Sequence, residues 1–210
     1  MKKRFAIKLL LIPKTINKVL FVFFLVAFSS QVVLADDKIV VKNMLKERFD
    51  EVITVVENKE LNDEAKKDKI EAIIKPIMDF PLMSMLTLGR SSWAAMTKED
   101  RVSFSELLTK LFRHSYLSKI LGYAGEDIIF EEPDQKNNKK IDIPAVIVSK
   151  DKNVSVKFKF YKRNSSWKVY DVEADGISFK NSYSAQFNDC MQESTIKECM
   201  VKLENKLTSQ

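Results

Sequence analysis

The spacing of apolar residues changes near residue 127, and this change constrains the fold more than any other feature of the sequence. Before it, apolar residues recur every three or four positions, which is typical of helices with one buried face. After it, Val154, Val156, Phe158 and Phe160 alternate with polar residues, which is typical of a strand with one apolar face. Helices followed by strands predict an α+β fold.

The expected helices carry recognisable signals at their ends. Asn62 and Thr97 are expected to cap two of them, with Asp100 in the capping-box position after Thr97. Pro76 is expected to kink or end one helix, and Gly89 to stop another. The expected helical stretches are residues 38–57, 62–77, 79–88, 97–116, 182–191 and 195–207.

The strands are expected to form an antiparallel meander, because short turns separate consecutive runs. The runs cover residues 128–132, 141–147, 154–160 and 167–172. The alternation breaks at Val169-Tyr170-Asp171-Val172, which predicts a bulge or burial on both faces. The polar stretch Asp134–Lys140 is expected to be a loop. The sequence therefore predicts helices packed on one face of a curved antiparallel sheet of about four strands.

The formal net charge of +6 comes entirely from the first 35 residues. The whole chain has 35 Lys+Arg and 29 Asp+Glu. Residues 1–35 contain six basic residues and no acidic one, so residues 36–210 hold 29 charges of each sign. A nucleic-acid binder needs a sustained basic surface to release counterions from phosphates. The neutral body therefore argues against nucleic acid as a partner.

The basic segment has the organisation of a secretory signal peptide. A basic start is followed by the apolar run Val19–Phe28 and by small residues leading to Ala35. Cleavage after about Ala35 would release a single exported domain, residues 36–210. An uncleaved membrane anchor is the alternative, although ten apolar residues fall short of the ~20 that a transmembrane helix needs.

Export changes the interpretation of Cys190 and Cys199, the two cysteines of the chain. An oxidising compartment allows them to pair. On one continuous helix they would lie ~13 Å apart, beyond disulfide reach, so a bridge requires a turn between them. Gln192–Thr195 is the expected turn, and a disulfide across a helical hairpin is the favoured interpretation. Two small buried thiols are the alternative.

The sequence offers few catalytic groups. His114 is its one histidine, no glycine-rich phosphate loop occurs, and no cluster of His and Cys has metal-ligand spacing. An enzyme, a metal site and a cofactor are therefore not expected. A hydrolase or isomerase would need a polar dyad inside the fold, for which the strands offer Asp142, Asp171 and Asp175. A buried structural carboxylate at the expected bulge is the favoured role for Asp171.

The apolar sheet face permits two interpretations. In most proteins such a face meets its helices and forms a dry core. A curved sheet that its helices do not fully close would instead leave an apolar cavity. Periodicity cannot distinguish the two.

Two blocks of sequence resemble the MlaC family, also described as the toluene-tolerance auxiliary family. The first runs from Asp79-Phe80-Pro81-Leu82-Met83 through Leu88-Gly89-Arg90, Trp93 and Thr97–Arg101 to Phe104, with Tyr116 near the helix end. The second runs from Trp167-Lys168-Val169-Tyr170-Asp171-Val172 through Gly176 and Ser178 to Asn181, Tyr183, Gln186 and Phe187. The order and spacing of these motifs span about residues 45–207. Asp100, where the family usually carries Gln, and the turn between the cysteines depart from its pattern.

The resemblance implies a periplasmic phospholipid carrier with an apolar lipid pocket between helices and sheet. It implies shuttling between an outer-membrane lipoprotein complex and an inner-membrane MCE-domain transporter, in support of outer-membrane lipid asymmetry. The carrier is expected to be a monomer. An exported α+β binding or scaffold protein with a solid core and no lipid ligand is the alternative.

The expected lipid-contacting residues are the inward residues of the strands and one stripe of the long helix. Which sheet face points inward is inferred from alternation, and a one-residue error in register would invert it. The expected lining residues are Phe104, Leu108, Leu111, Phe112, Ile141, Ile143, Val154, Val156, Phe158, Phe160, Trp167 and Val169.

Overall fold

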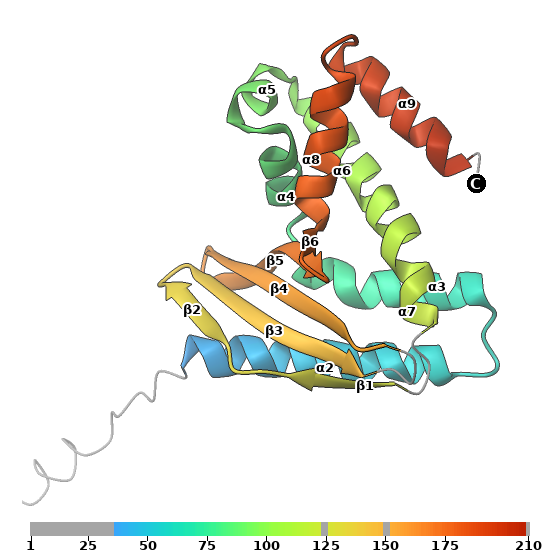
Figure 1. Ribbon diagram of the computed structural model, residues 1–210, viewed down its shortest axis with the longest axis vertical. Coiled ribbons are helices and arrows are strands. Elements are labelled where there is room, and N and C mark those ends of the chain that lie inside the picture. The colour runs from blue at the N-terminus through green and yellow to red at the C-terminus, as the bar shows by residue number, and fades with distance from the viewer. Residues whose placement is uncertain (1–35, 123–125, 149–151, 209–210) are drawn as a thin grey trace, which may run out of the picture. The chain divides into compact units, whose positions relative to one another are not determined.

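The computed structural model describes residues 36–122, 126–148 and 152–208, and shows helices packed against a curved antiparallel sheet (Figure 1). The predicted leader, residues 1–35, lies outside the described residues, as do residues 123–125, 149–151 and 209–210. The helical segments are α2 (Asp37–Glu57), α3 (Asp63–Ile74), η1 (Lys75–Ile77), α4 (Phe80–Leu88), α5 (Arg90–Ala95), α6 (Lys98–Phe112), η2 (Arg113–Leu117), α7 (Ser118–Leu121), α8 (Phe179–Cys190) and α9 (Ile196–Thr208). Among the described residues, no helix is long and apolar enough to cross a membrane.

The sheet has the order β1-β3-β4-β5-β6, with β2 also paired to β3, and all pairings are antiparallel. Its strands are β1 (Asp127–Phe130), β2 (Asp134–Asn137), β3 (Lys140–Val148), β4 (Val154–Arg163), β5 (Ser166–Ala174) and β6 (Ile177–Ser178). The α+β class is confirmed, but β2 occupies the stretch expected to be a loop. Every residue of β2 is exposed, so no alternation of apolar residues could reveal it. Only its backbone pairing with β3 defines it.

A bulge in β5 changes which of its residues face inward. Lys159 pairs with Asp171 while the next residue, Phe160, pairs with Val169, so Tyr170 is the extra residue. The side chain of Val169 points inward before the bulge, and that of Val172, paired with Phe158, does so after it. The predicted break in alternation is therefore a bulge, and it brings two more positions of β5 to the inner face.

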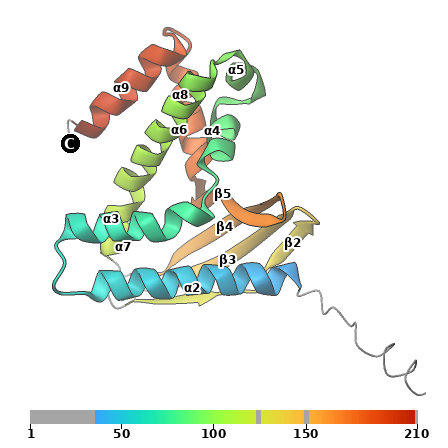
Figure 2. The ribbon, with the colours of Figure 1, turned by 180° about the vertical axis from the view of Figure 1, so that it is seen from behind.

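Helix α2 lies across the apolar face of the sheet, and α3 runs back beside it (Figure 2). The Phe49 ring packs edge-on against Phe130 and Phe158, with centroids 5.3 and 5.4 Å away. The expected caps are present: Asn62 accepts from the Ala65 amide at 2.8 Å. Helix α3 ends at Ile74, just before Pro76, and η1 continues the chain. These helices cover one face of the sheet.

Helices α4, α6 and α8 stand together beside the β5–β6 edge and form a second packed layer (Figure 1). Its core is aromatic: Phe104 lies 4.8 Å from Phe187, and Phe112 lies 5.3 Å from Phe179, between ring centroids. The short helix α5, which the sequence did not predict, follows Gly89, whose φ of 79° favours glycine. This layer buries much of the stripe predicted for α6.

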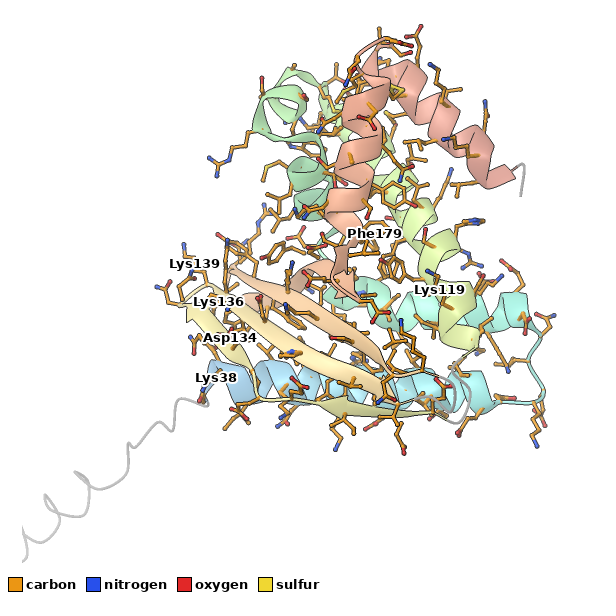
Figure 3. All side chains as sticks on the ribbon, in the orientation of Figure 1. Lys38, Lys119, Asp134, Lys136, Lys139 and Phe179 are labelled. Atoms are coloured by element: carbon orange, nitrogen blue, oxygen red, sulfur yellow. A yellow bond between two sulfur atoms is a disulfide. The ribbon has the colours of Figure 1, made fainter. Side chains whose placement is uncertain are left out.

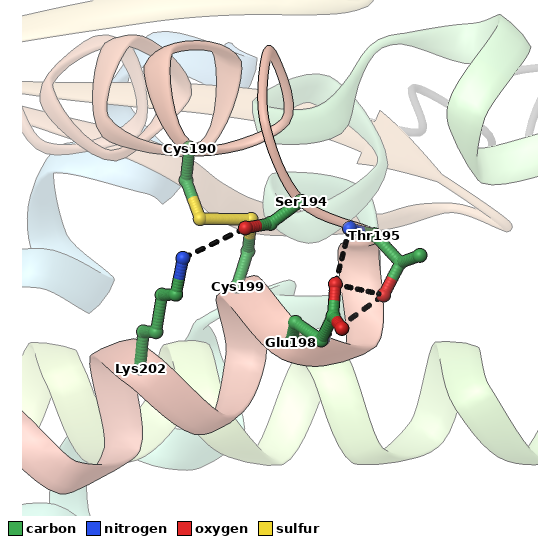
Figure 4. The surroundings of a disulfide bond; sticks show 6 residues. All are labelled: Cys190, Ser194, Thr195, Glu198, Cys199 and Lys202. Carbon is green, nitrogen blue, oxygen red and sulfur yellow. Dashed lines mark hydrogen bonds between the residues drawn. A yellow bond between two sulfur atoms is a disulfide. The ribbon is translucent and has the colours of Figure 1, made fainter.

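A disulfide joins α8 to α9 (Figure 4). Cys190 and Cys199 are bonded, with their Cα atoms 5.8 Å apart. Thr195 begins α9 with a capping box, because its Oγ1 accepts from the Glu198 amide and its own amide donates to the Glu198 carboxylate at 2.8 Å. The turn between the cysteines reverses the chain, which is what allows residues nine apart to meet. Helix α9 is thus tied to α8 covalently.

Replacing both cysteines by serine should lower the free energy of unfolding by about 2.5 kcal/mol. A disulfide stabilises mainly by restricting the unfolded chain, and a loop of about ten residues gives this magnitude. In a chain of this size the melting temperature should fall by about 5–10 °C. Thermal unfolding by circular dichroism measures the shift, and the parent protein in reductant is the matched control. An unchanged melting temperature in both would show that the bond does not stabilise the fold.

Candidate functional site

An apolar cavity of about 430 Å³ lies between the sheet and helix α2. Strand residues form one wall and α2 forms the facing wall. Residues of α3, η1, α6, η2 and α7 line the side between them. The lining residues are Leu45, Arg48, Phe49, Val52, Ile74, Ile77, Met78, Phe112, Tyr116, Lys119, Ile120, Ile147, Val154, Val156, Phe158, Val169, Val172, Ala174, Asp175 and Ile177. Most of these side chains are apolar, so the cavity suits an apolar ligand. Its volume lies within the range of about 300–1,000 Å³ that small-molecule sites occupy.

The sheet is packed solid at one end and hollow at the other. At the solid end, the Asp37 carboxylate at the start of α2 accepts from Lys162 Nζ at 2.8 Å and from Trp167 Nε1 at 3.1 Å. The Lys162 hydrogen bond is the main reason that the pKa of Asp37 lies below its ordinary value. Ile141 and Ile143 are fully buried there. These contacts hold the start of α2 against the strands, so side chains fill the space over that half of the sheet's apolar face.

The hollow end is bounded by a π-helical turn, η2, between α6 and α7. Arg113 at its start is held to α3 by Asp68 at 2.9 Å and Glu71 at 2.9 Å, and also by Glu64. The predicted helix was one continuous stretch from residue 97 to residue 116. In the structure α6 ends at Phe112, and the chain continues as the wider π-helical turn η2. Tyr116 of this turn lines the cavity. Such turns occur often at functional sites.

Three charged side chains lie on the cavity wall, and two of them are neutralised by neighbours. Arg48 donates to both carboxylate oxygens of Glu51 at 2.8 Å. Asp175 accepts from Lys152 at 2.8 Å, and this hydrogen bond is the largest of the effects that lower its pKa. Lys119, which is labelled in Figure 3, places its Nζ 5.7 Å from the centroid of the Tyr116 ring. No ion pair joins Lys119 to a carboxylate in the described part of the chain.

Tyr116 has a neutral hydroxyl at physiological pH. Burial raises the pKa of its phenol to about 12, and the negative charge of Asp171 acts in the same direction. Its ring stacks on Phe112 at 5.0 Å and meets Phe179 edge-on at 5.6 Å. The residue is therefore a rigid part of the wall that keeps a hydrogen-bond donor.

The structure places five of the twelve predicted lipid-contacting residues on the cavity wall and seven in the packed core. Those on the wall are Phe112, Val154, Val156, Phe158 and Val169. Those in the core, outside the wall, are Phe104, Leu108, Leu111, Ile141, Ile143, Phe160 and Trp167. The strand residues of both groups share one face, so the predicted register is correct. The strand residues of the two groups differ in their position along the strands. Those in the core lie at the solid end of the sheet, and those on the wall lie at the hollow end.

Phe112 is the one predicted residue in the part of the described wall that helices provide. Leu45, Phe49 and Val52 share one apolar face of α2 and line the cavity, but their helical spacing is that of any buried helix face. Lys119 and Ile120 follow the π-helical turn, for which the sequence carried no signal. Val172 and Ala174 come to the cavity through the bulge, which the broken alternation did indicate.

Asp142, Asp171 and Asp175 do not form a dyad in the cavity, since of these three only Asp175, in the turn between β5 and β6, lies on its wall. Asp171 is 1% exposed and accepts from Ser178 Oγ at 2.8 Å and from the Lys180 amide at 3.2 Å. It therefore holds the bulge to the start of α8, as expected of a structural carboxylate. Within the described residues, no group of three or more His, Cys, Asp or Glu side chains could hold a metal ion.

Comparisons with known proteins agree with this architecture. The family model described as MlaC protein matches residues 46–205. A solved structure described as the phospholipid-binding protein from Ralstonia solanacearum in complex with a phospholipid has the same fold, with a TM-score of 0.73. It is 17% identical, and the similarity covers 83% of this chain and 98% of that one. A search of curated proteins finds no match.

Proposed function

Because the chain belongs to the MlaC family, we propose that it is a periplasmic carrier that holds a phospholipid in the cavity between α2 and the sheet. The observation that carries the proposal is the cavity itself, whose wall is made mainly of Val, Ile, Leu and Phe side chains. The similar fold of a protein described as being in complex with a phospholipid supports it. The solid-core scaffold would need no such hollow.

The energetics of lipid transfer explain why such a carrier would be needed. Two acyl chains with ~30 methylenes together would cost on the order of 24 kcal/mol to expose to water, at ~0.8 kcal/mol per methylene. Free diffusion of a phospholipid through an aqueous compartment is therefore negligible. A protein that covers the tails and leaves the head group at the cavity mouth removes most of this cost without any chemistry.

The proposed carrier is exported by the basic leader, works as a monomer and is not an enzyme. It exchanges lipid with an inner-membrane MCE-domain transporter and an outer-membrane lipoprotein complex, and so supports outer-membrane lipid asymmetry. The family membership supports these roles. The neutral charge balance of residues 36–210 means that recognition of either complex would depend on local patches rather than on net charge.

Native mass spectrometry of the protein purified from a bacterial periplasm tests the proposal. We expect a chain that begins at Asp36 and carries diacyl phospholipid in stoichiometric amount. Organic extraction of the same sample identifies the lipid class. A folded protein with no extractable lipid, which also takes up none from vesicles, would favour the scaffold alternative.

A further inference from the structure

The ammonium group of Lys119 is the one charge on the cavity wall without a carboxylate partner in the described part of the chain. Arg48 is neutralised by Glu51, and Asp175 by Lys152. Lys119 is exposed, while Phe112 and Val156 on the same cavity wall are buried. It therefore lies where the apolar wall reaches solvent, which is where the polar end of a bound lipid must stay.

Tyr116 lies one helical turn before Lys119 on the same wall. The two side chains are in contact, because Lys119 Nζ lies 5.7 Å from the centre of the Tyr116 ring. Among the described residues, no hydrogen bond engages the Tyr116 hydroxyl. The pair thus presents one positive charge and one neutral O–H donor, which together suit an oxyanion rather than a cation.

Resting on the proposed function, we infer that Lys119 and Tyr116 bind the phosphodiester of the lipid head group and make the cavity selective for phospholipids over diacylglycerol. Asp175 does not oppose this, since its carboxylate is engaged by Lys152 Nζ and by the Ser155 amide at 3.1 Å. A second hollow, on the solvent side of α2, has only polar lining residues and offers no apolar wall for the tails. The phosphate site therefore belongs to the apolar cavity.

A competition experiment tests the inference. Delipidated full-length protein is incubated with vesicles that contain equal amounts of phosphatidylglycerol and diacylglycerol with the same acyl chains. Native mass spectrometry then measures the ratio of the two bound lipids. The parent protein should prefer phosphatidylglycerol. Lys119→Gln should lower the ratio about fivefold, which is typical of an exposed charge contact. Tyr116→Phe should lower it about threefold, since only a neutral hydrogen bond is lost.

Two control variants separate the charge from other effects. Lys119→Arg keeps the positive charge and should keep the preference. Lys98→Gln removes an exposed lysine at the first position of α6, away from the cavity wall, and should change nothing. A Lys119→Gln variant that loses both lipids equally, or a parent protein that loads both equally, would overturn the phosphate site while leaving the carrier function intact. A parent protein that binds neither lipid would overturn the carrier function itself.

Discussion

Val156→Asp should leave the protein folded but without bound phospholipid. Val156 lies on β4, lines the cavity and is 6% exposed. A carboxylate there would face acyl chains, and burying it beside them would cost several kcal/mol without a hydrogen-bond partner. Water can hydrate it only if the lipid leaves. Native mass spectrometry should show occupancy falling from near one lipid per chain to near zero, and Phe158→Asp should behave in the same way.

Two further variants separate loss of lipid from loss of the fold. Ile129→Asp adds the same charge on β1, which is separated from β4 by β3 and where the side chain is 57% exposed, and should keep full occupancy. Ala174→Trp fills the cavity from β5 without adding a charge and should also exclude lipid. Circular dichroism checks that each variant is folded. Retained lipid in folded Val156→Asp and Ala174→Trp would show that the ligand does not occupy this cavity.

Phe104→Ala should destabilise the protein by about 4 kcal/mol and leave lipid occupancy unchanged. Phe104 is fully buried in the layer formed by α4, α6 and α8. The centre of its ring lies 4.8 Å from that of Phe187 and 6.4 Å from that of Trp93. Removing a buried phenyl ring costs transfer free energy and leaves a void, together about 3–5 kcal/mol. Urea unfolding monitored by circular dichroism measures the change, and native mass spectrometry measures the lipid in the folded fraction.

Val102→Ala is the matched control on the same helix. Val102 is 55% exposed, so its truncation should change stability by less than about 0.5 kcal/mol. If Phe104→Ala lost its lipid while still fully folded, Phe104 would contact the ligand as the sequence had suggested. In case the alanine variant does not fold, Phe104→Leu keeps most of the volume and allows the same comparison.

The class of the fold could be predicted from the sequence because it depends on local periodicity. The change from helical spacing to alternation located the sheet, and the caps at Asn62 and Thr97 located helix starts within one or two residues. The break in alternation located the bulge. Strand β2 and helix α5 escaped prediction, because all of β2 and much of α5 are exposed.

The candidate site could be predicted only in part, because burial against protein and burial against a cavity select the same side chains. Val156 and Phe160 lie on one strand face and share the same alternation, yet Val156 lines the cavity and Phe160 lies in the core. The two residues differ in their distance from the end of the sheet where Lys162 and Trp167 bind Asp37 of α2. These contacts connect residues more than 100 positions apart, and no local pattern encodes them.

The sequence by itself determined the inward face of the predicted strands, the neutral charge of residues 36–210 and the resemblance to a lipid-carrying family. Those properties follow from residue type and spacing alone. Only the tertiary structure decided which half of the apolar face is hollow and which lysine on the cavity wall has no carboxylate partner among the described residues. Both depend on how α2 and the π-helical turn before α7 are held against distant segments, because a cavity exists only where packing between such segments is incomplete.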